Sequence, residues 1–136
     1  MNIKRKILIV DDDADLQDMV RGLLEHYDFE CYSAFSIDEG LSLNRQHLFD
    51  LVLLDLHFDE SDGRNFLENL RDDALLTGDV PPPVMVMSTD RERSVVENVL
   101  KTGAKGFFAK PLQPLRFVKS VYEYVNSSSS LTLNTR

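Results

Sequence analysis

Side chains that could do chemistry follow the apolar runs of this sequence. In chain order they are Asp11, Asp12, Asp13, Asp55, Ser88, Thr89 and Lys110. Two carboxylates about 4 Å apart repel by about 4 kcal/mol at an effective dielectric near 20, so a group of aspartates favours a bound cation. Sites made of carboxylate oxygens suit Mg²⁺, which keeps several waters and binds phosphate oxygens. If the fold gathers these residues, they predict a Mg²⁺ site that handles a phosphoryl group.

The elements that would position these residues are short apolar runs alternating with amphipathic stretches. Runs of strand length lie at residues 7–10, 29–35, 51–54, 84–87 and 106–109. Apolar residues recur between them at helical spacing. The faces predicted to be buried include Leu16, Met19, Val20, Leu23, Leu24 and Tyr27 in the first helix, Val95, Val96, Val99 and Leu100 in the fourth, and Val118, Val121, Tyr122 and Val125 in the fifth.

The boundaries between these elements carry residues typical of helix ends. Ser36 and Glu39 predict a capping box, Gly103 a helix C-cap, and Pro114 the first turn of the last helix. Five β–α units in a row predict an α/β fold, the flavodoxin-like (βα)5 type, with a doubly wound five-stranded parallel sheet. The active crevice of such a sheet lies beyond the carboxyl ends of its strands, so the reactive side chains should meet there.

The reactive residues sit in motifs that resemble those of the response-regulator receiver family of two-component signalling. The motifs are Val10-Asp11-Asp12-Asp13, Leu53-Leu54-Asp55-Leu56, Asp62-Gly63, Ser88-Thr89 and Lys110-Pro111. Their order and spacing match the family over roughly residues 5–126. The resemblance implies a receiver domain over residues 1–126, followed by a Ser-rich flexible tail or the start of a linker over residues 127–136.

The resemblance also implies the roles of the acids and the lysine. Asp55 is similar to the aspartate that accepts a phosphoryl group. Asp11, Asp12 and Asp55 resemble the acids that bind Mg²⁺, with the backbone carbonyl of His57 as a further ligand. Lys110 resembles the lysine that pairs first with the acceptor and then with a phosphoryl oxygen.

A second set of implied roles concerns the response to phosphorylation. Ser88 is similar to the switch hydroxyl of the family, and Phe107 is either the aromatic switch residue or simple core. His57, Thr89 and Asp90 flank the approach of the water that would hydrolyse an acyl phosphate. The implied partners are a sensor histidine kinase or phosphotransfer protein, a downstream effector domain or protein, and a second copy in a phosphorylation-dependent homodimer.

The sequence departs from the usual family pattern at several positions. Asp59 stands where proline is common, Thr89 where alanine or glycine is frequent, and Phe107 where tyrosine is often found. Residues 72–83 form a longer connection than is typical. These departures bear on kinetics and partner choice, and none falls on the implied phosphoacceptor, metal-binding or lysine positions.

Other interpretations of the same residues stay open. A degenerate receiver would serve only as a protein-binding scaffold. A haloacid-dehalogenase-like phosphatase would need a second aspartate two residues after Asp55, where this sequence has His57. Asp13 is as consistent with a helix-start acid as with a metal ligand, and Cys31, in an apolar run, is expected to be buried packing.

Composition limits the class of partner and the compartment. The net charge of −8 argues against direct nucleic-acid binding, which uses clustered Lys and Arg. The basic start is followed by only four apolar residues, too few for a signal peptide or membrane span. A single cysteine excludes an internal disulfide, so we expect a soluble, cytoplasmic protein with no membrane partner.

Overall fold

The computed structural model describes residues 3–58 and 63–134, with residues 127–134 described by their backbone alone. Strands and helices alternate along these residues as the sequence predicts. The strands are β1 (Lys6–Val10), β2 (Glu30–Ala34), β3 (Leu51–Asp55), β4 (Val84–Ser88) and β5 (Gly106–Ala109). The helices are α1 (Ala14–His26), α2 (Ile37–Gln46), α3 (Arg64–Thr77), α4 (Arg93–Thr102) and α5 (Pro114–Asn134).

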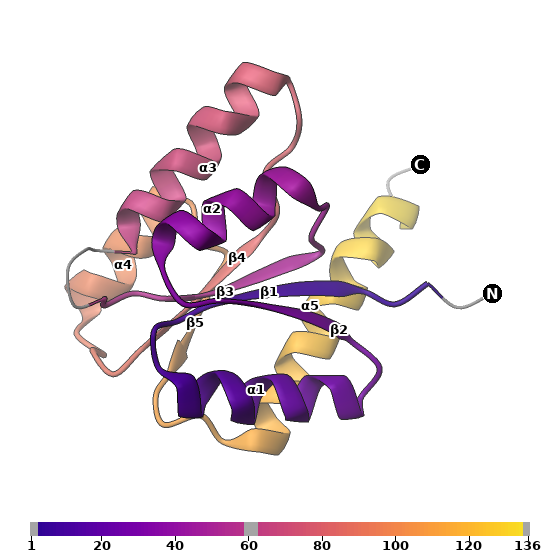
Figure 1. Ribbon diagram of the computed structural model, residues 1–136, viewed down its shortest axis with the longest axis vertical. Coiled ribbons are helices and arrows are strands. Elements are labelled where there is room, and N and C mark those ends of the chain that lie inside the picture. Colours follow the sequence, from indigo (N-terminus) through magenta and orange to yellow (C-terminus); the bar gives the residue numbers. More distant parts are fainter. Residues whose placement is uncertain (1–2, 59–62, 135–136) are drawn as a thin grey trace.

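The strands form one parallel sheet in the order β2-β1-β3-β4-β5. Figure 1 shows α1 and α5 on one side of the sheet and α2, α3 and α4 on the other. The predicted flavodoxin-like, doubly wound fold is therefore confirmed. The strand order reverses between β1 and β3, and in such sheets ligands bind beyond the carboxyl ends of the strands at this point.

Two hydrophobic cores lie on opposite faces of the sheet. The α1/α5 core includes Ile7, Ile9, Leu51, Leu53, Met85 and Met87 from the strands. The α2–α4 core includes Leu8, Val10, Val52, Leu54, Val84 and Val86. Successive strand residues face opposite cores, because side chains alternate across a strand. The central strands are buried on both faces, as their continuous apolar runs predict.

The predicted helix boundaries at α2, α4 and α5 are confirmed. Ser36 Oγ accepts a hydrogen bond from Glu39 N at 3.1 Å, and Glu39 Oε1 accepts one from Phe35 N at 2.7 Å. Gly103 ends α4 with φ of 123°, in the region that favours glycine. Pro114 is the first residue of α5. Local sequence signals therefore define these helix ends.

Four large side chains predicted to be buried are exposed instead. They are Met19 at 39%, Tyr27 at 43%, Leu100 at 44% and Tyr122 at 54% exposure. Met19, Leu100 and Tyr122 each adjoin a fully or nearly buried valine in the sequence, and a helix turns by about 100° per residue, so each is rotated off the buried face. Tyr27 lies beyond the last residue of α1. The predicted faces were therefore too wide.

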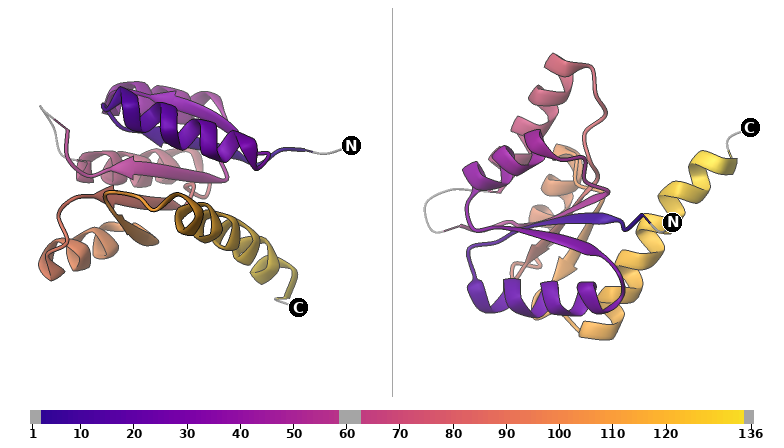
Figure 2. Two further views of the ribbon diagram at one scale, coloured as in Figure 1. Left: turned by 90° about the horizontal axis from the view of Figure 1, so that it is seen from below. Right: turned by 45° about the vertical axis from the view of Figure 1, so that its right-hand side comes forward.

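Helix α5 runs further than the sequence predicts. It continues to Asn134, into the segment 127–136 that was predicted to be a Ser-rich flexible tail or the start of a linker. Serine lowers helix stability by less than about 0.7 kcal/mol per residue relative to alanine, and a helix already begun extends with one hydrogen bond per residue. Figure 2 shows the last turns of α5 projecting past the sheet. Within the described residues, neither α5 nor another helix has the apolar length needed to cross a membrane.

Candidate functional site

Asp11, Asp55 and Lys110 meet beyond the carboxyl ends of β1, β3 and β5. The Lys110 ammonium lies 2.9 Å from Asp11 Oδ2 and 3.1 Å from Asp55 Oδ1. Asp11 is fully buried and Asp55 is 6% exposed. Each of the three continues the strand alternation of the α1/α5 face. The sheet therefore brings together residues that are as many as 99 positions apart in the sequence.

Backbone hydrogen bonds hold this cluster in place. Asp13 N donates to Asp11 Oδ1 at 2.9 Å. The backbone N–H of His57 donates to the Asp55 carboxylate. Lys110 N donates to Ser88 O at 2.8 Å, which ties the residue after β5 to the end of β4. The charged groups are thus oriented by the main chain before any ligand arrives.

The pKa values of the cluster follow from burial and from its charges. Burial, and then the neighbouring Asp11 carboxylate, raise the pKa of Asp55 above its ordinary value, although Lys110 opposes the rise. Burial lowers the pKa of Lys110, but its hydrogen bonds and charge interactions with Asp11 and Asp55 outweigh that effect and raise it. Lys110 is therefore a protonated cation between two acids. Further positive charge beside Asp55 would stabilise its ionised carboxylate.

Asp11, Asp12 and Asp55 have the donor chemistry of a hard-cation site. One carboxylate oxygen from each lies within 4.8 Å of the others. An oxygen-only site with three acids and one exposed member, Asp12, suits Mg²⁺, because this ion binds a few carboxylates and keeps its remaining waters. Asp13 instead caps α1, accepting from Asp15 N and Leu16 N. The backbone carbonyl of His57 stays a prediction as a metal ligand.

Ser88 and Phe107 lie toward the other face of the sheet. Ser88 is fully buried, and its Oγ accepts a hydrogen bond from Asp90 N at 3.0 Å. It shares the alternation of Val86, which pairs in register with Phe107. Phe107 is partly buried and packs against the α2–α4 core. The two residues therefore lie on adjacent strands and on the face opposite to that of Asp55.

The residues expected to affect hydrolysis of an acyl phosphate lie just after β3 and just after β4. Thr89 and His57 are exposed, and Asp90 is partly buried. Asp90 Oδ1 accepts a hydrogen bond from Glu92 N at 3.0 Å, so one oxygen of this carboxylate stabilises the turn before α4. Asp59, the other departure near the site, lies outside the described residues.

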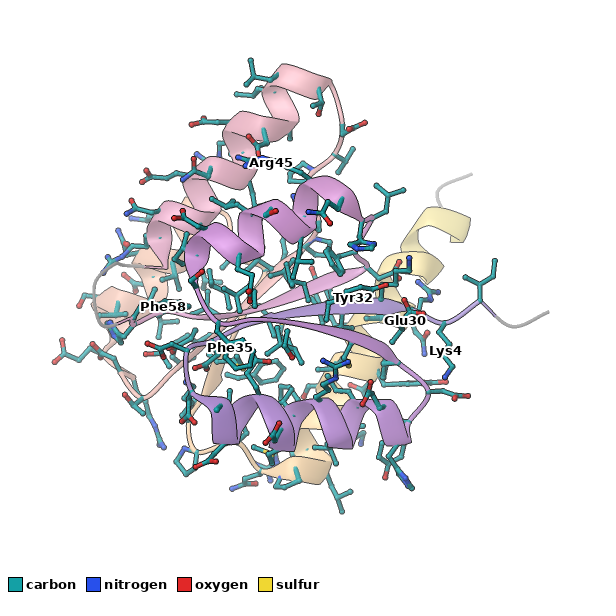
Figure 3. All side chains as sticks on the ribbon, in the orientation of Figure 1. Lys4, Glu30, Tyr32, Phe35, Arg45 and Phe58 are labelled. Carbon is teal, nitrogen blue, oxygen red and sulfur yellow. The ribbon has the colours of Figure 1, made fainter. Side chains whose placement is uncertain are left out.

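A hollow of about 840 Å³ opens beside Asp12, between α2 and α3. Phe35, which is 47% exposed, and Phe58 line the end of it near the acids, and Arg45 lines it further along α2 (Figure 3). Arg45 pairs with Asp73 at 3.1 Å. Asp12 and two aromatic rings therefore line one hollow.

Two residues that support the site, Gly63 and Gln17, were not among the predicted site residues. Gly63 approaches the end of β3 so closely that a Cβ there would lie 2.6 Å from the Asp55 carbonyl oxygen, and its N–H donates to Leu56 O at 2.8 Å. Gln17 is 1% exposed beside the Asp11 backbone. The Asp62-Gly63 motif pointed to the first, although Asp62 itself lies outside the described residues. For Gln17, the available signal is its helical spacing from Val20 and Leu24, which puts a polar residue on a buried face.

Cys31 lies in β2 at 4% exposure, as expected for a packing residue. Burial is the largest cause that raises the pKa of its thiol, to about 12. Because the thiolate is the reactive form, this cysteine is protonated and inert at neutral pH.

The raised pKa of Asp55 predicts how stability depends on pH in the metal-free protein. The folded state holds the Asp55 proton to higher pH than the unfolded state does, so the free energy of unfolding falls as pH rises between the two pKa values. Asp55→Asn removes this dependence and should be more stable than wild type at pH 7 in EDTA. Urea unfolding from pH 4 to pH 8 measures the difference, which should shrink toward low pH. A difference that stays constant with pH would contradict this account, and Asp38→Asn, at an exposed position on α2, is the control.

Comparison with known proteins agrees with this geometry. A sequence model described as the response regulator receiver domain matches residues 7–122. The chain is 30% identical over 118 residues to an uncharacterized 14.6 kDa protein of Leptolyngbya boryana, covering 87% of this chain and 88% of that protein. It is 31% identical over 117 residues to the phosphate regulon transcriptional regulatory protein PhoB of Escherichia coli K12, covering 86% of this chain. Because only 50% of PhoB is covered, the chain spans about half the length of that relative.

A solved structure shows the same fold. The CheY-like response regulator receiver domain protein from Methanospirillum hungatei superposes with a TM-score of 0.82 and 24% identity, covering 94% of this chain and 98% of that one. The family is one of signalling domains rather than of enzymes in the usual sense. With the match over most of its length and the acids and lysine at the strand ends, the chain belongs to the receiver domain family of two-component response regulators.

Proposed function

We propose that Asp55 accepts a phosphoryl group from the phosphohistidine of a sensor histidine kinase or phosphotransfer protein, in a reaction that requires Mg²⁺. The observation that carries the proposal is the Lys110 ammonium held between the Asp11 and Asp55 carboxylates, beside a third acid, Asp12. Phosphoryl transfer depends mainly on positioning and on charge stabilisation, and this cluster can supply both.

The proposed step uses groups already oriented in the structure. An Asp55 carboxylate oxygen forms a bond to phosphorus while the P–N bond of the donor imidazole breaks, and the bonding pair goes to the imidazole nitrogen. Lys110 then pairs with a phosphoryl oxygen, for which its high pKa keeps it charged. Mg²⁺ held by Asp11, Asp12 and Asp55 would neutralise negative charge on the transferring oxygens.

The test is labelling of the wild-type chain with radioactive acetyl phosphate and Mg²⁺. Incorporation of alkali-labile, hydroxylamine-sensitive phosphate, which does not occur when EDTA replaces Mg²⁺, supports an acyl phosphate. A degenerate receiver acting as a scaffold would bind partners without incorporating phosphate, so an unlabelled protein would sink the proposal. A haloacid-dehalogenase-like phosphatase would turn over phosphate esters continuously, and such turnover would also contradict it.

We further propose that phosphorylation is transmitted by Ser88 and Phe107. A phosphoryl group on Asp55 attracts the Ser88 hydroxyl, which now lies buried near the end of the neighbouring strand. Its movement would change the packing of Phe107 against the α2–α4 core and reshape the surface of α4, β5 and α5. That surface would bind an effector or a second copy of the chain, as a shift between two states of one fold.

Ser88→Ala tests this coupling. The variant should accept phosphate at Asp55 but show little change at the surface of α4, β5 and α5, because it lacks the hydroxyl that moves. Amide chemical shifts along β5 and sedimentation of phosphorylated protein measure the response. Ser94→Ala, at an exposed position on α4, should respond as wild type does. A Ser88→Ala protein that also responds fully would show that the coupling runs elsewhere.

Thr89 is predicted to lengthen the life of the acyl phosphate. Its β-branched side chain has few rotamers and crowds the approach of the hydrolytic water more than alanine would. Thr89→Ala should therefore lose phosphate faster by a factor of a few, about 1 kcal/mol in barrier height. The decay rate after removal of the donor is the measurement, and Asp90→Ala is the comparison, in which loss of a carboxylate that could order the attacking water should slow the decay instead. An unchanged or slower decay in Thr89→Ala would exclude crowding as the cause.

Family membership also suggests the compartment of the protein and its connection to an effector. We place the protein in the cytoplasm, where a kinase would meet it. Relatives such as PhoB extend about as far again as the matched region, so we propose as effector either a further domain or a separate protein that binds the same surface. Residues 127–136 are the proposed connection to such a domain, and α5 supplies a helical start for it.

A further inference from the structure

Gln17 is a polar side chain on the buried face of α1. It is 1% exposed and shares that face with Val20 and Leu24. A buried amide is costly unless it is hydrogen-bonded, so its partners indicate why it is there. They are all backbone carbonyls at the edge of the candidate site.

The Gln17 amide nitrogen lies 2.9 Å from Ile9 O, 3.1 Å from Asp11 O and 2.9 Å from Ala34 O. Ala34 O also accepts a hydrogen bond from Asp11 N at 3.0 Å. An amide NH₂ has only two hydrogens, so three carbonyls share them. Gln17 thereby links the end of β1 and the residue after it to the last residue of β2.

The Asp11 carbonyl belongs to the peptide that joins Asp11 to Asp12. Rotation of this peptide would move both carboxylates relative to Asp55. Asp11 is held at its side chain by Lys110 and by Asp13 N, but the Asp12 carboxylate has no hydrogen-bond partner among residues 3–58 and 63–134. The place of Asp12 is therefore set by its backbone.

The other end of the Gln17 amide indicates that this arrangement has a stability cost. Its Oε1 is buried and has no hydrogen-bond partner within the described part of the chain. A buried acceptor without a hydrogen-bond partner destabilises the folded state. An apolar side chain of the same length, such as methionine, would avoid that cost but would leave the three carbonyls without this donor.

We propose that Gln17 is a positioning residue that fixes the Asp11–Asp12 peptide, and with it the two carboxylates, in the arrangement that binds Mg²⁺. The proposal rests on the proposed function, because it concerns the cation site that phosphoryl transfer to Asp55 would use. Groups that hold a metal ligand in place typically change metal affinity by about 10–100-fold when removed, although they never touch the metal.

The experiment compares the full chain carrying Gln17→Met, Gln17→Asn or Val20→Ala with wild type. Gln17→Met keeps the length and loses the donor, and Gln17→Asn keeps the amide but is one methylene too short to reach all three carbonyls. Val20→Ala removes fully buried packing from the same face of α1 without touching these hydrogen bonds. Calorimetric titration gives the Kd for Mg²⁺, and thermal unfolding in EDTA gives the stability of each protein.

We expect Gln17→Met to raise the Kd for Mg²⁺ about 10-fold or more, and Val20→Ala to bind like wild type despite its lower stability. A second readout needs no metal: exchange of the Asp11 amide proton, measured by NMR in EDTA, should be faster in Gln17→Met by more than its change in global stability accounts for, whereas in Val20→Ala it should change only as global stability does. These two results together separate positioning from general destabilisation. If Gln17→Met does not fold, Gln17→Asn is compared in the same way.

A folded Gln17 variant with wild-type Mg²⁺ affinity overturns the proposal, and so does an equal loss of affinity in Val20→Ala. Failure of the inference is distinguishable from failure of the proposed function. If wild type binds Mg²⁺ and is labelled by acetyl phosphate while the Gln17 variants bind equally well, only the role of Gln17 is wrong. If wild type binds no Mg²⁺, the proposed function and this inference fail together.

Discussion

Asp55→Asn is expected to abolish incorporation of phosphate from acetyl phosphate. Asparagine keeps the size of the side chain and can still accept a hydrogen bond from Lys110, but its neutral amide is not a nucleophile for phosphorus. The loss should be complete within detection, because Asp55 is the acid that lies at the end of the central strand β3 with Lys110 at 3.1 Å. Intact-mass spectrometry and radiolabelling of the folded variant measure it.

The matched control for this experiment is Asp13→Asn. Asparagine caps a helix about as well as aspartate, so the start of α1 should be preserved. Asp13 caps α1 and lies outside the three-acid cluster, so this variant should be labelled like wild type. Stable phosphate on Asp55→Asn would assign the acceptor to another residue, and Asp59 would then be the first to replace.

Asp12→Ala is expected to weaken Mg²⁺ binding by an order of magnitude or more. The change removes one of three carboxylates from an oxygen-only site, and about 1.4 kcal/mol of lost interaction already corresponds to a factor of ten. Because Asp12 is exposed, its removal should leave the fold and its stability nearly intact. Calorimetry in the absence of any phosphoryl donor gives the affinity directly.

Two further titrations make the Asp12 result specific. Asp13→Asn should bind Mg²⁺ like wild type, because Asp13 caps α1 and lies outside the three-acid cluster. Asp38→Asn, an exposed acid lining the hollow near Asp12, controls for the general loss of negative charge around the site. If Asp12→Ala binds as tightly as these controls do, Asp12 is not a ligand.

The grouping of Asp11, Asp55 and Lys110 could be predicted from the sequence for a physical reason. Parallel strands end at one edge of the sheet, so the residue after each apolar run must lie at that edge. Strand alternation then selects the members that share a face. The same logic puts Ser88 on the other face, which it shares with Phe107 of the adjacent strand.

Other features depend on details that apolar spacing does not carry. Met19 and Tyr122 are exposed because the buried stripe of each helix is narrower than its run of apolar residues. The role of Gln17 depends on three carbonyls from two strands, none of which is visible in a helical pattern. The extension of α5 to Asn134 reflects a helix continuing through serines, whereas composition alone favours a tail.

Because the two cores lie on opposite faces of the sheet, substitutions in them should affect different properties of the domain. Asp11, Asp55 and Lys110 follow the alternation of the α1/α5 core, whereas Ser88 and Phe107 follow that of the α2–α4 core. On the proposed function, whether the chain is phosphorylated and what phosphorylation does are decided on opposite sides of one layer of strands. Substitutions in the α1/α5 core could therefore alter the rates of phosphorylation and dephosphorylation while leaving partner binding unchanged. Substitutions in the α2–α4 core could change which partner is bound without loss of phosphorylation at Asp55.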